Sequence, residues 1–494
     1  MVMNTKRYII SALALLLINF HIKAGTTDTI YNASLFGIKS NGTTLNTTSI
    51  QKAVDYISEK GGGTLRFYVG RYLTGTIELK SNVTILLEEG AILLGSTSIY
   101  DYNIKEPIPG LLYAKGAENI AIRGKGVIDG QGREVAYNLV DQIHKGVIED
   151  PMKYDRPDNK RPHGIYFREC KGVNIYGIII KNSATWVQTY DQCENVVVDS
   201  ITVISTAFWN NDGIDIVDCK NFKLLNSYID AADDAICLKS HDKTKRNENV
   251  EIRNNVARSS ANGIKFGTVS AGGYRNIRII NNKVYNTLRS ALTIATPDGG
   301  IIEDIFVDSL YAYHTGNPIY LRIGARWNNE RIGSMKNITI QNFYAEITEE
   351  KPDAGYEIEG PVEDNPRNIS PSGIVGLKNM LIENVKLKNI EISYPGNGNP
   401  NYAYRGTSAK ALSEIPEMET AYPEFSQFKE LPAWGFFIKN ARNISFENVK
   451  LIARNKDYRP AIVMDNVNGY SFKNLQIKEA GVKKKKQMIK NNSK

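Results

Sequence analysis

Asn195-Val-Val-Val and Asn221-Phe-Lys-Leu are two copies of one short phrase, an Asn or Gly followed by an apolar residue, any residue and a second apolar residue. Successive copies from Gly172 to Asn276 stand 23, 26, 28 and 27 residues apart. A repeat of roughly 20–50 residues is typical of a solenoid, and the apolar–polar alternation within each copy is typical of strands. The remaining copies begin at Asn82, Asn119, Asn249, Asn337, Asn379 and Asn443.

The repeat predicts an all-β fold, a single right-handed parallel β-helix. A coil of about 25 residues can hold several short strands, and each coil stacks on the next at the ~4.8 Å spacing of strands. Asn and Gly at the phrase starts suit tight corners with left-handed backbone. The side chains predicted to fill the core of the central coils are those of Ile214, Ile216, Ile236, Leu238, Ile264 and Phe266.

The N-terminal residues 1–24 predict a signal peptide. A basic start at Lys6 and Arg7 is followed by an apolar run over residues 8–20 and by a small residue, Ala24. The run is shorter than the ~20 residues of a membrane span, and the first cysteine, Cys170, is too distant for a lipid anchor. We therefore expect a secreted or periplasmic protein without membrane insertion.

The body of the chain is predicted to be one domain. Residues 25–482 would form the β-helix, and residues 48–60 predict a short amphipathic helix that caps its N-terminal end. Residues 483–494 predict a basic, disordered tail. The net charge is +8, but without the predicted signal peptide and tail it is −1. Because the body is nearly neutral, its charge does not indicate a nucleic-acid partner, and we expect a monomer without a cofactor.

Three aspartates occupy neighbouring coils. Asp212 precedes Gly213, and Asp233 and Asp234 follow one coil later, Asp233 standing 21 residues after Asp212. The three carboxylates should converge at one corner, with no counter-charge obvious nearby, and such crowding should raise at least one pKa. Hydrolysis of a glycosidic bond needs one protonated carboxyl for the leaving oxygen and one ionised carboxylate for water. The alternatives are a calcium site or aspartates that form turns.

Cys170, Cys193 and Cys219 each lie two residues before their phrase, so they should be neighbours along one ladder. Two of them could form a disulfide in an oxidising compartment. Alternatively, all three are buried thiols that behave as small apolar side chains. No His lies near them at ligand spacing, and we expect no metal.

Four motifs carry a resemblance to a known family. They are residues 119–132 (Asn-Ile-Ala-Ile-Arg-Gly-Lys-Gly-Val-Ile-Asp-Gly-Gln-Gly), Arg161-Pro162, Asn211-Asp212-Gly213-Ile214-Asp215 and Asp233-Asp234. With these motifs the sequence resembles the polygalacturonase family, glycoside hydrolase family 28, over almost the whole mature chain. The resemblance implies a pectin-lyase-like solenoid with Asp233 as general acid, Asp212 and Asp234 holding and deprotonating water, and inversion at the anomeric carbon.

Two motifs of that family are missing. Its Gly-His-Gly falls at Ala261-Asn262-Gly263, and its Arg-Ile-Lys, which grips a galacturonate carboxylate past the scissile bond, falls at Thr293-Ile-Ala295. We therefore expect a weaker hold on an acidic leaving sugar. The residues predicted to bind substrate are Asp215, Asn262, Lys265, Tyr320 and Arg322, although Lys265 could equally be a charge partner of the aspartates.

Together these features predict a secreted, polygalacturonase-like glycoside hydrolase of pectic polysaccharides or oligosaccharides. Its substrates would have rhamnogalacturonan-type or galacturonide linkages, and its role would be pectin degradation in cell wall organization. Residues 135–160 and 397–433 break the repeat and could wall off a groove, which favours cleavage at chain ends. Two alternatives are a catalytically impaired sugar-binding β-helix and a polysaccharide lyase or epimerase.

Overall fold

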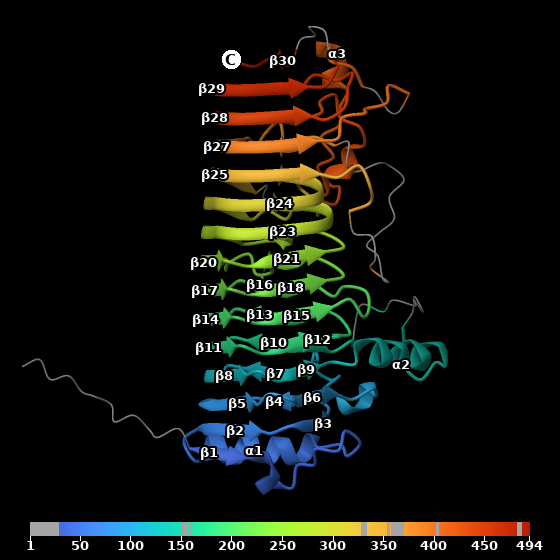
Figure 1. The fold of residues 1–494 in the computed structure, drawn as a ribbon, viewed down its shortest axis with the longest axis vertical. Coiled ribbons are helices and arrows are strands. Elements are labelled where there is room, and N and C mark those ends of the chain that lie inside the picture. Colours follow the sequence, from blue (N-terminus) through green and yellow to red (C-terminus); the bar gives the residue numbers. More distant parts are fainter. Residues whose placement is uncertain are drawn as a thin grey trace, which may run out of the picture.

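Parallel strands stack coil upon coil along one axis, from β1 at the N-terminal end to β30 at the C-terminal end (Figure 1). The computed structural model describes residues 29–150, 157, 160–327, 333–352, 356, 370–401, 405–481 and 487–494. The predicted right-handed parallel β-helix is confirmed. The predicted signal peptide, residues 1–24, lies outside the described residues.

Each coil contributes strands to three sheets, which we call the site sheet, the ladder sheet and the third sheet. The site sheet contains β4 (Ile77–Glu78), β7 (Gly110–Lys115), β10 (His163–Arg168), β13 (Gln188–Asp191), β16 (Ile214–Val217), β19 (Ile236–Ser240), β22 (Ile264–Ser270), β26 (Ser372–Val375) and β30 (Met488–Asn491). The ladder sheet contains β1 (Ile30–Asn32), β2 (Gly63–Phe67), β5 (Val83–Leu87), β8 (Glu118–Gly124), β11 (Lys171–Tyr176), β14 (Glu194–Asp199), β17 (Lys220–Leu225) and β20 (Asn247–Arg253). The third sheet contains β3 (Gly70–Thr74), β6 (Ala91–Gly95), β9 (Val127–Asp129), β12 (Ile179–Lys181), β15 (Thr202–Ser205), β18 (Tyr228–Ala231) and β21 (Val256–Ser259).

In the C-terminal half, single strands run on around the corners from one sheet to the next. They are β23 (Gly273–Thr296), β24 (Ile301–Ile323), β25 (Ser334–Ile347), β27 (Ile382–Tyr394), β28 (Phe436–Ala453) and β29 (Ile462–Glu479). Inside the coils, equivalent apolar residues stack in rows: Ile214 pairs with Ile236, and Ile236 with Ile264. All six predicted core residues of these coils are fully buried, so the predicted register is confirmed there.

The corners that precede the ladder sheet carry a stack of asparagines. Asn195, Asn221, Asn249 and Asn276 have φ between 52° and 57°, the left-handed region that Asn tolerates better than most residues. Asn221, Asn249 and Asn276 each donate their side-chain amide to the asparagine of the preceding coil, at 2.8–3.1 Å. One predicted copy is wrong: Asn384 (φ 57°), not Asn379, continues the stack, because β27 begins only at Ile382.

Three α-helices of the described residues lie outside the strands. The predicted cap is α1 (Thr47–Glu59), which buries Ile50, Ala53, Val54 and Ile57 against the first coils. The other two, α2 (Gly132–His144) and α3 (Ala409–Ser413), lie along the same edge of the stack (Figure 1). Short 3-10 turns are η1 (Ala33–Phe36), η2 (Ile99–Asp101) and η3 (Phe425–Phe428).

The chain end differs from the predicted disordered tail. Residues 488–491 form β30, which continues the site sheet beyond β29. Lys494 also exchanges backbone hydrogen bonds with Val467 and Gly469. The Lys490 ammonium group lies 4.4 Å from the ring centre of Tyr470. The described part of the tail is thus a last rung that covers β29, since these backbone and ring contacts hold it in place.

The four cysteines are buried and free. Cys170, Cys193 and Cys219 lie within the core, where burial raises the pKa of Cys193. Of the two predicted alternatives, a disulfide or buried thiols, the structure shows the buried thiols. Within the described residues, no helix is long and apolar enough to cross a membrane.

Candidate active site

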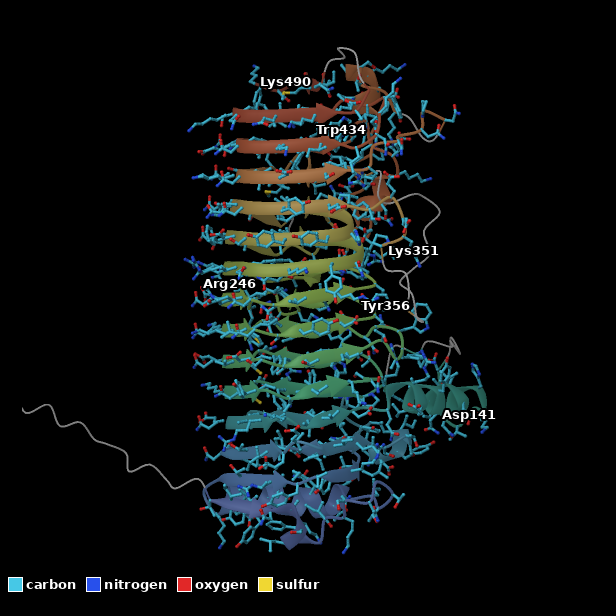
Figure 2. All side chains as sticks on the ribbon, in the orientation of Figure 1. Asp141, Arg246, Lys351, Tyr356, Trp434 and Lys490 are labelled. Atoms are coloured by element: carbon cyan, nitrogen blue, oxygen red, sulfur yellow. The ribbon has the colours of Figure 1, made fainter. Side chains whose placement is uncertain are left out.

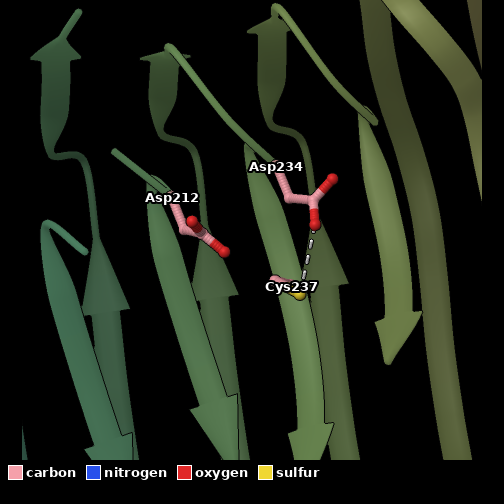
Figure 3. Close-up of side chains that lie close together, drawn as sticks. All are labelled: Asp212, Asp234 and Cys237. Atoms are coloured by element: carbon pink, nitrogen blue, oxygen red, sulfur yellow. Dashed lines mark hydrogen bonds between the residues drawn. The ribbon is translucent and has the colours of Figure 1, made fainter. Parts of the chain in front are cut away.

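The three aspartates lie at one corner, where the chain turns from the third sheet into the site sheet. Asp212 precedes β16 and Asp234 precedes β19, and the pairing of Ile214 with Ile236 makes them neighbours on adjacent coils (Figure 3). The ladder neighbour of Asp212 is thus Asp234, one residue from the predicted Asp233. Asp212 and Asp234 are buried, whereas Asp233 is half-buried and accepts a hydrogen bond from the Asp234 amide at 2.9 Å.

The turn that presents Asp212 is fixed by its neighbour Asn211. The side-chain oxygen Oδ1 of Asn211 accepts hydrogen bonds from the Ser205 hydroxyl and from the Ala207 and Phe208 backbone amides at 3.0–3.2 Å. Its amide group donates to the carbonyls of the preceding coil at 2.9 Å. Because this fully buried side chain has all its partners, it holds the turn in one conformation.

Lys239 supplies a counter-charge that sequence reasoning missed. Its ammonium group donates to Asp212 at 2.8 Å and also contacts Asp215. It also lies 3.9 Å from the ring centre of Trp186, a close cation–π contact. The sequence contained a signal for this position. Side chains alternate along β19, so Lys239 lies on the same outward face of the strand as Cys237, which pairs with Asp215 and Lys265.

Lys265 is the counter-charge of Asp234. Its ammonium group lies 2.8 Å from the Asp234 carboxylate and 2.9 Å from the Tyr422 hydroxyl. Asn262, which stands where the family has histidine, donates its side-chain amide to Asp234 at 2.7 Å and its backbone amide at 3.1 Å. Of the two predicted roles for Lys265, this geometry is that of a charge partner.

The carboxylates at this corner differ in ionisation. Burial would raise the pKa of Asp234, but the ammonium groups of Lys265 and Lys239 outweigh it and lower the pKa to about 2. Asp212 and Asp215 share one ammonium group, so burial prevails: it raises the pKa of Asp212 well above its usual value and that of Asp215 to about 6. One corner thus holds a firmly ionised carboxylate beside carboxylates that take up a proton more readily.

Asp212, Asp234 and Cys237 also bring potential metal ligands within 4.8 Å of one another (Figure 3). The Cys237 thiol points to Asp234 at 3.9 Å, and burial raises its pKa, which disfavours the thiolate that metals prefer. Both aspartates already pair with ammonium groups. The donor set is therefore that of a charge-compensated cluster rather than of a metal centre.

A cavity of about 350 Å³ opens on the N-terminal side of the aspartates. Burial and the neighbouring Arg161 lower the pKa of His163 to about 3, and burial lowers that of His241 to about 4, so both imidazoles are neutral near pH 6. The walls of the cavity thus offer an aromatic ring, neutral polar groups and two cationic residues. The residues that line the cavity are Pro107, Ile108, Pro109, Lys160, Arg161, His163, Thr185, Trp186, Asn210 and His241.

A wall closes the C-terminal side. Residues 412–431 pack on the outer face of the site sheet and form a second apolar cluster with Tyr320 and Phe437, separate from the solenoid core. Arg322 donates to the backbone carbonyls of Glu417 and, at 2.9 Å, of Met418. Tyr320 and Arg322 lie one coil beyond Thr293 and Ala295 as predicted, but they hold this wall instead of facing an open groove.

The same wall reaches the aspartates. Glu424 lies 3.1 Å from the guanidinium of Arg289, and both side chains are buried. The ring centre of Tyr422 lies 5.6 Å from the Arg289 guanidinium, and the Tyr422 hydroxyl accepts a hydrogen bond from Lys265. On the adjoining edge, the Tyr356 hydroxyl (Figure 2) donates to Asp230 of β18 at 2.7 Å, three residues before Asp233. The aspartates thus lie between this wall and the cavity on their N-terminal side.

The five predicted substrate-binding residues are all at most 2% exposed. Asp215 contacts Lys239, and Asn262 donates to Asp234 while accepting from the Thr293 hydroxyl at 3.1 Å. Lys265 pairs with Asp234, and Tyr320 and Arg322 support the wall. The structure gathers the first three around the catalytic candidates and separates the last two from them.

The chain is similar to known proteins in sequence and in fold. Residues 61–302 match glycosyl hydrolases family 28. An exo-poly-alpha-D-galacturonosidase of Dickeya chrysanthemi is 25% identical over 63% of this chain and 62% of its own length, and a probable polygalacturonase of Vitis vinifera is 28% identical over 56% and 60%. An exopolygalacturonase from Thermotoga maritima shares the fold with a TM-score of 0.59, at 24% identity over 74% of this chain and 87% of that one.

The chain spans about three-fifths of the length of the two curated relatives. The matched region contains the aspartate corner and both of its lysines, and the shared fold extends well beyond it. The chain therefore belongs to glycosyl hydrolases family 28.

Proposed function

We propose that this protein is a secreted, inverting glycoside hydrolase that acts at the ends of pectic chains or on oligosaccharides. The observation that carries the proposal is the aspartate corner, where Lys265 and Asn262 keep Asp234 ionised beside the half-buried Asp233. A glycosidase needs such a pair, one carboxylate for water and one carboxyl for the leaving oxygen.

The proposed roles follow from exposure and charge. The pKa of Asp234 is lowered to about 2, so its carboxylate stays ionised and can accept a hydrogen bond from the attacking water and orient it. Asp212, on the adjacent coil, would hold the same water from a second side. Asp233 is the most exposed of the three, and it would protonate the departing oxygen. Water then attacks the anomeric carbon opposite the bond that breaks, which gives inversion.

We further propose that the leaving sugar is uncharged. Thr293 and Ala295 replace the cations that would hold a carboxylate there. Three other cations of the C-terminal side have internal partners: Lys265 has Asp234, Arg289 has Glu424, and Arg322 has the Met418 carbonyl. Rhamnose of the galacturonate–rhamnose backbone fits this requirement, because a neutral sugar loses nothing when the cations are occupied.

The wall on the C-terminal side favours action on short substrates or chain ends. The segment 412–431 covers the site sheet from Tyr320 onward, and the cavity lined by Trp186 lies on the opposite side of the aspartates. A site closed on one side in this way leaves room for few sugar units beyond the scissile bond on that side.

A substrate panel tests the proposal. Purified protein is incubated with rhamnogalacturonan oligosaccharides and with homogalacturonan oligosaccharides of equal length, and new reducing ends and their anomeric form are followed by NMR. We expect at least about tenfold higher kcat/KM on the rhamnogalacturonan series, with inverted product. Equal or better cleavage of homogalacturonan contradicts the neutral leaving sugar. Unsaturated products would indicate a lyase, and binding without products would indicate a sugar-binding protein.

A further inference from the structure

Lys239 is a buried cation that contacts both the aspartate corner and the cavity on its N-terminal side. Its side chain is 7% exposed, and its ammonium group contacts two carboxylates of β16 and the turn before it, those of Asp215 and Asp212. The same ammonium group lies 3.9 Å from the ring centre of Trp186, and Trp186 lines the cavity on the N-terminal side. One charge thus touches both a catalytic candidate and a wall of the sugar-sized cavity.

We infer that Lys239 is a positioning residue, which fixes the carboxylate of Asp212 and the indole of Trp186 relative to each other. The inference rests on the proposed function, since it assigns Asp212 to the hydrolytic water. A neutral hydrogen-bond donor could hold one carboxylate, but it could not compensate two carboxylates that are at most 4% exposed. Nor could it bind the face of an indole ring as an ammonium group does.

The surroundings of Lys239 determine what its removal does. Asp233 and Asp234 face Asp212 from the next coil, and both oppose its ionisation. Without the ammonium group, the carboxylates of Asp212 and Asp215 would lose their attraction and ionise only at higher pH. The titratable groups that face Lys239 itself are Asp212, Asp215, Asp234, Cys237, His163 and His241.

The expected signature is therefore a change in pH dependence. A water-activating group must be ionised, so the acidic limb of the kcat/KM profile should move to higher pH when Lys239 is removed. We expect Lys239→Met to shift this limb by at least about one pH unit, so that activity falls at least about tenfold at pH 5 and partly recovers above pH 7. Lys239→Arg, which keeps the charge, should hold the limb near its original position.

Two controls separate this role from a merely structural one. Lys439 is a buried lysine of the same sheet, 3.8 Å from Asp465 and remote from the aspartate corner, and Lys439→Met should leave the acidic limb in place. Trp186→Phe removes the indole, so Lys239→Met should change tryptophan emission in the wild-type background and not in the Trp186→Phe background. A uniform loss of activity at all pH values, or an unmoved limb, overturns the inference.

The proposed function can fail independently of this inference. If no substrate is cleaved, the difference in melting temperature between wild type and Lys239→Met is compared at pH 7 and pH 4. The gap should narrow at pH 4, because the two carboxylates left without a counter-charge become protonated and neutral there. A gap of the same size at both pH values overturns the role of Lys239 without reference to catalysis.

Discussion

Replacement of Lys265 by methionine tests whether the aspartate corner is built on buried ion pairs. The Lys265 and Asp234 side chains are each 3% exposed, and their charged atoms lie 2.8 Å apart. At that distance and an effective dielectric constant of about 20, the Coulomb attraction is about 6 kcal/mol. Removal of one partner leaves the other charge buried, and such changes destabilise proteins by about 3–5 kcal/mol. We expect Lys265→Met to lower the free energy of unfolding by that amount at pH 7.

The assay is a double-mutant cycle measured by chemical denaturation. Wild type, Lys265→Met, Asp234→Asn and the double variant are compared, and the double variant should be more stable than the sum of the single changes predicts, by about 2 kcal/mol. The control is Lys473→Met, because Lys473 is 78% exposed and 3.6 Å from Glu447, and an exposed pair contributes about 0–1 kcal/mol. If Lys265→Met costs no more than this control and only raises KM, Lys265 binds substrate instead of compensating Asp234.

Three further outcomes are expected. Asp233→Asn should lower kcat by about 10²–10⁴ without loss of stability, since it removes proton donation alone; near-normal turnover on the best substrate would contradict its role as acid. The pKa of His163 is lowered to about 3, so this residue contributes stability above about pH 6.5 that is lost as the pH falls toward 3. His163→Gln should therefore narrow the difference in the free energy of unfolding between pH 7 and pH 4, measured by urea unfolding. An unchanged difference would show that His163 does not titrate as described. Deletion of residues 487–494 should lower stability by at least about 1 kcal/mol, because β30 pairs with β29, and a melting temperature equal to that of the full chain would show that the last rung contributes nothing.

Most of the fold was predictable because a solenoid repeats one local rule. Alternation fixed which residues of β16, β19 and β22 face inward, and the asparagine corners marked where each coil begins. The prediction was wrong at Asn379, where an extra turn delays β27, since two residues of similar type stand five positions apart and only pairing with Asn337 selects Asn384. It was also wrong for residues 488–491, where the preceding lysine run conceals a strand that forms on the edge of β29.

The aspartate corner was predictable, as were a raised pKa within it and Lys265 as a charge partner, but its second counter-charge was not predicted. Spacing alone places Asp212 and Asp234 on adjacent coils, but Lys239 was missed because it lies 27 residues from Asp212 and appears in the sequence as one lysine among many. The break in the repeat at residues 397–433 predicted a wall, which the segment 412–431 forms, but it could not predict the contacts of that wall. Tyr422 reaches Lys265 across 157 residues, and a contact of that separation depends on how an irregular segment packs, for which the repeat carries no information.

The charge arrangement links the missing motifs to the choice of substrate. Asn262, which the resemblance aligns with the family's histidine, donates two hydrogen bonds to Asp234, and Lys265 adds an ammonium group to the same carboxylate. The cations on the side of the leaving sugar thus already have internal partners: Lys265 keeps one carboxylate ionised, and Arg289 and Arg322 bind the wall. A substrate carboxylate at this position would have to displace a buried partner from Lys265 or Arg289, and the displaced carboxylate would then stay buried without a counter-charge. The same change costs a neutral sugar nothing. Under the proposed function, we therefore expect these ion pairs to disfavour an acidic leaving sugar even though positive charge lies close by.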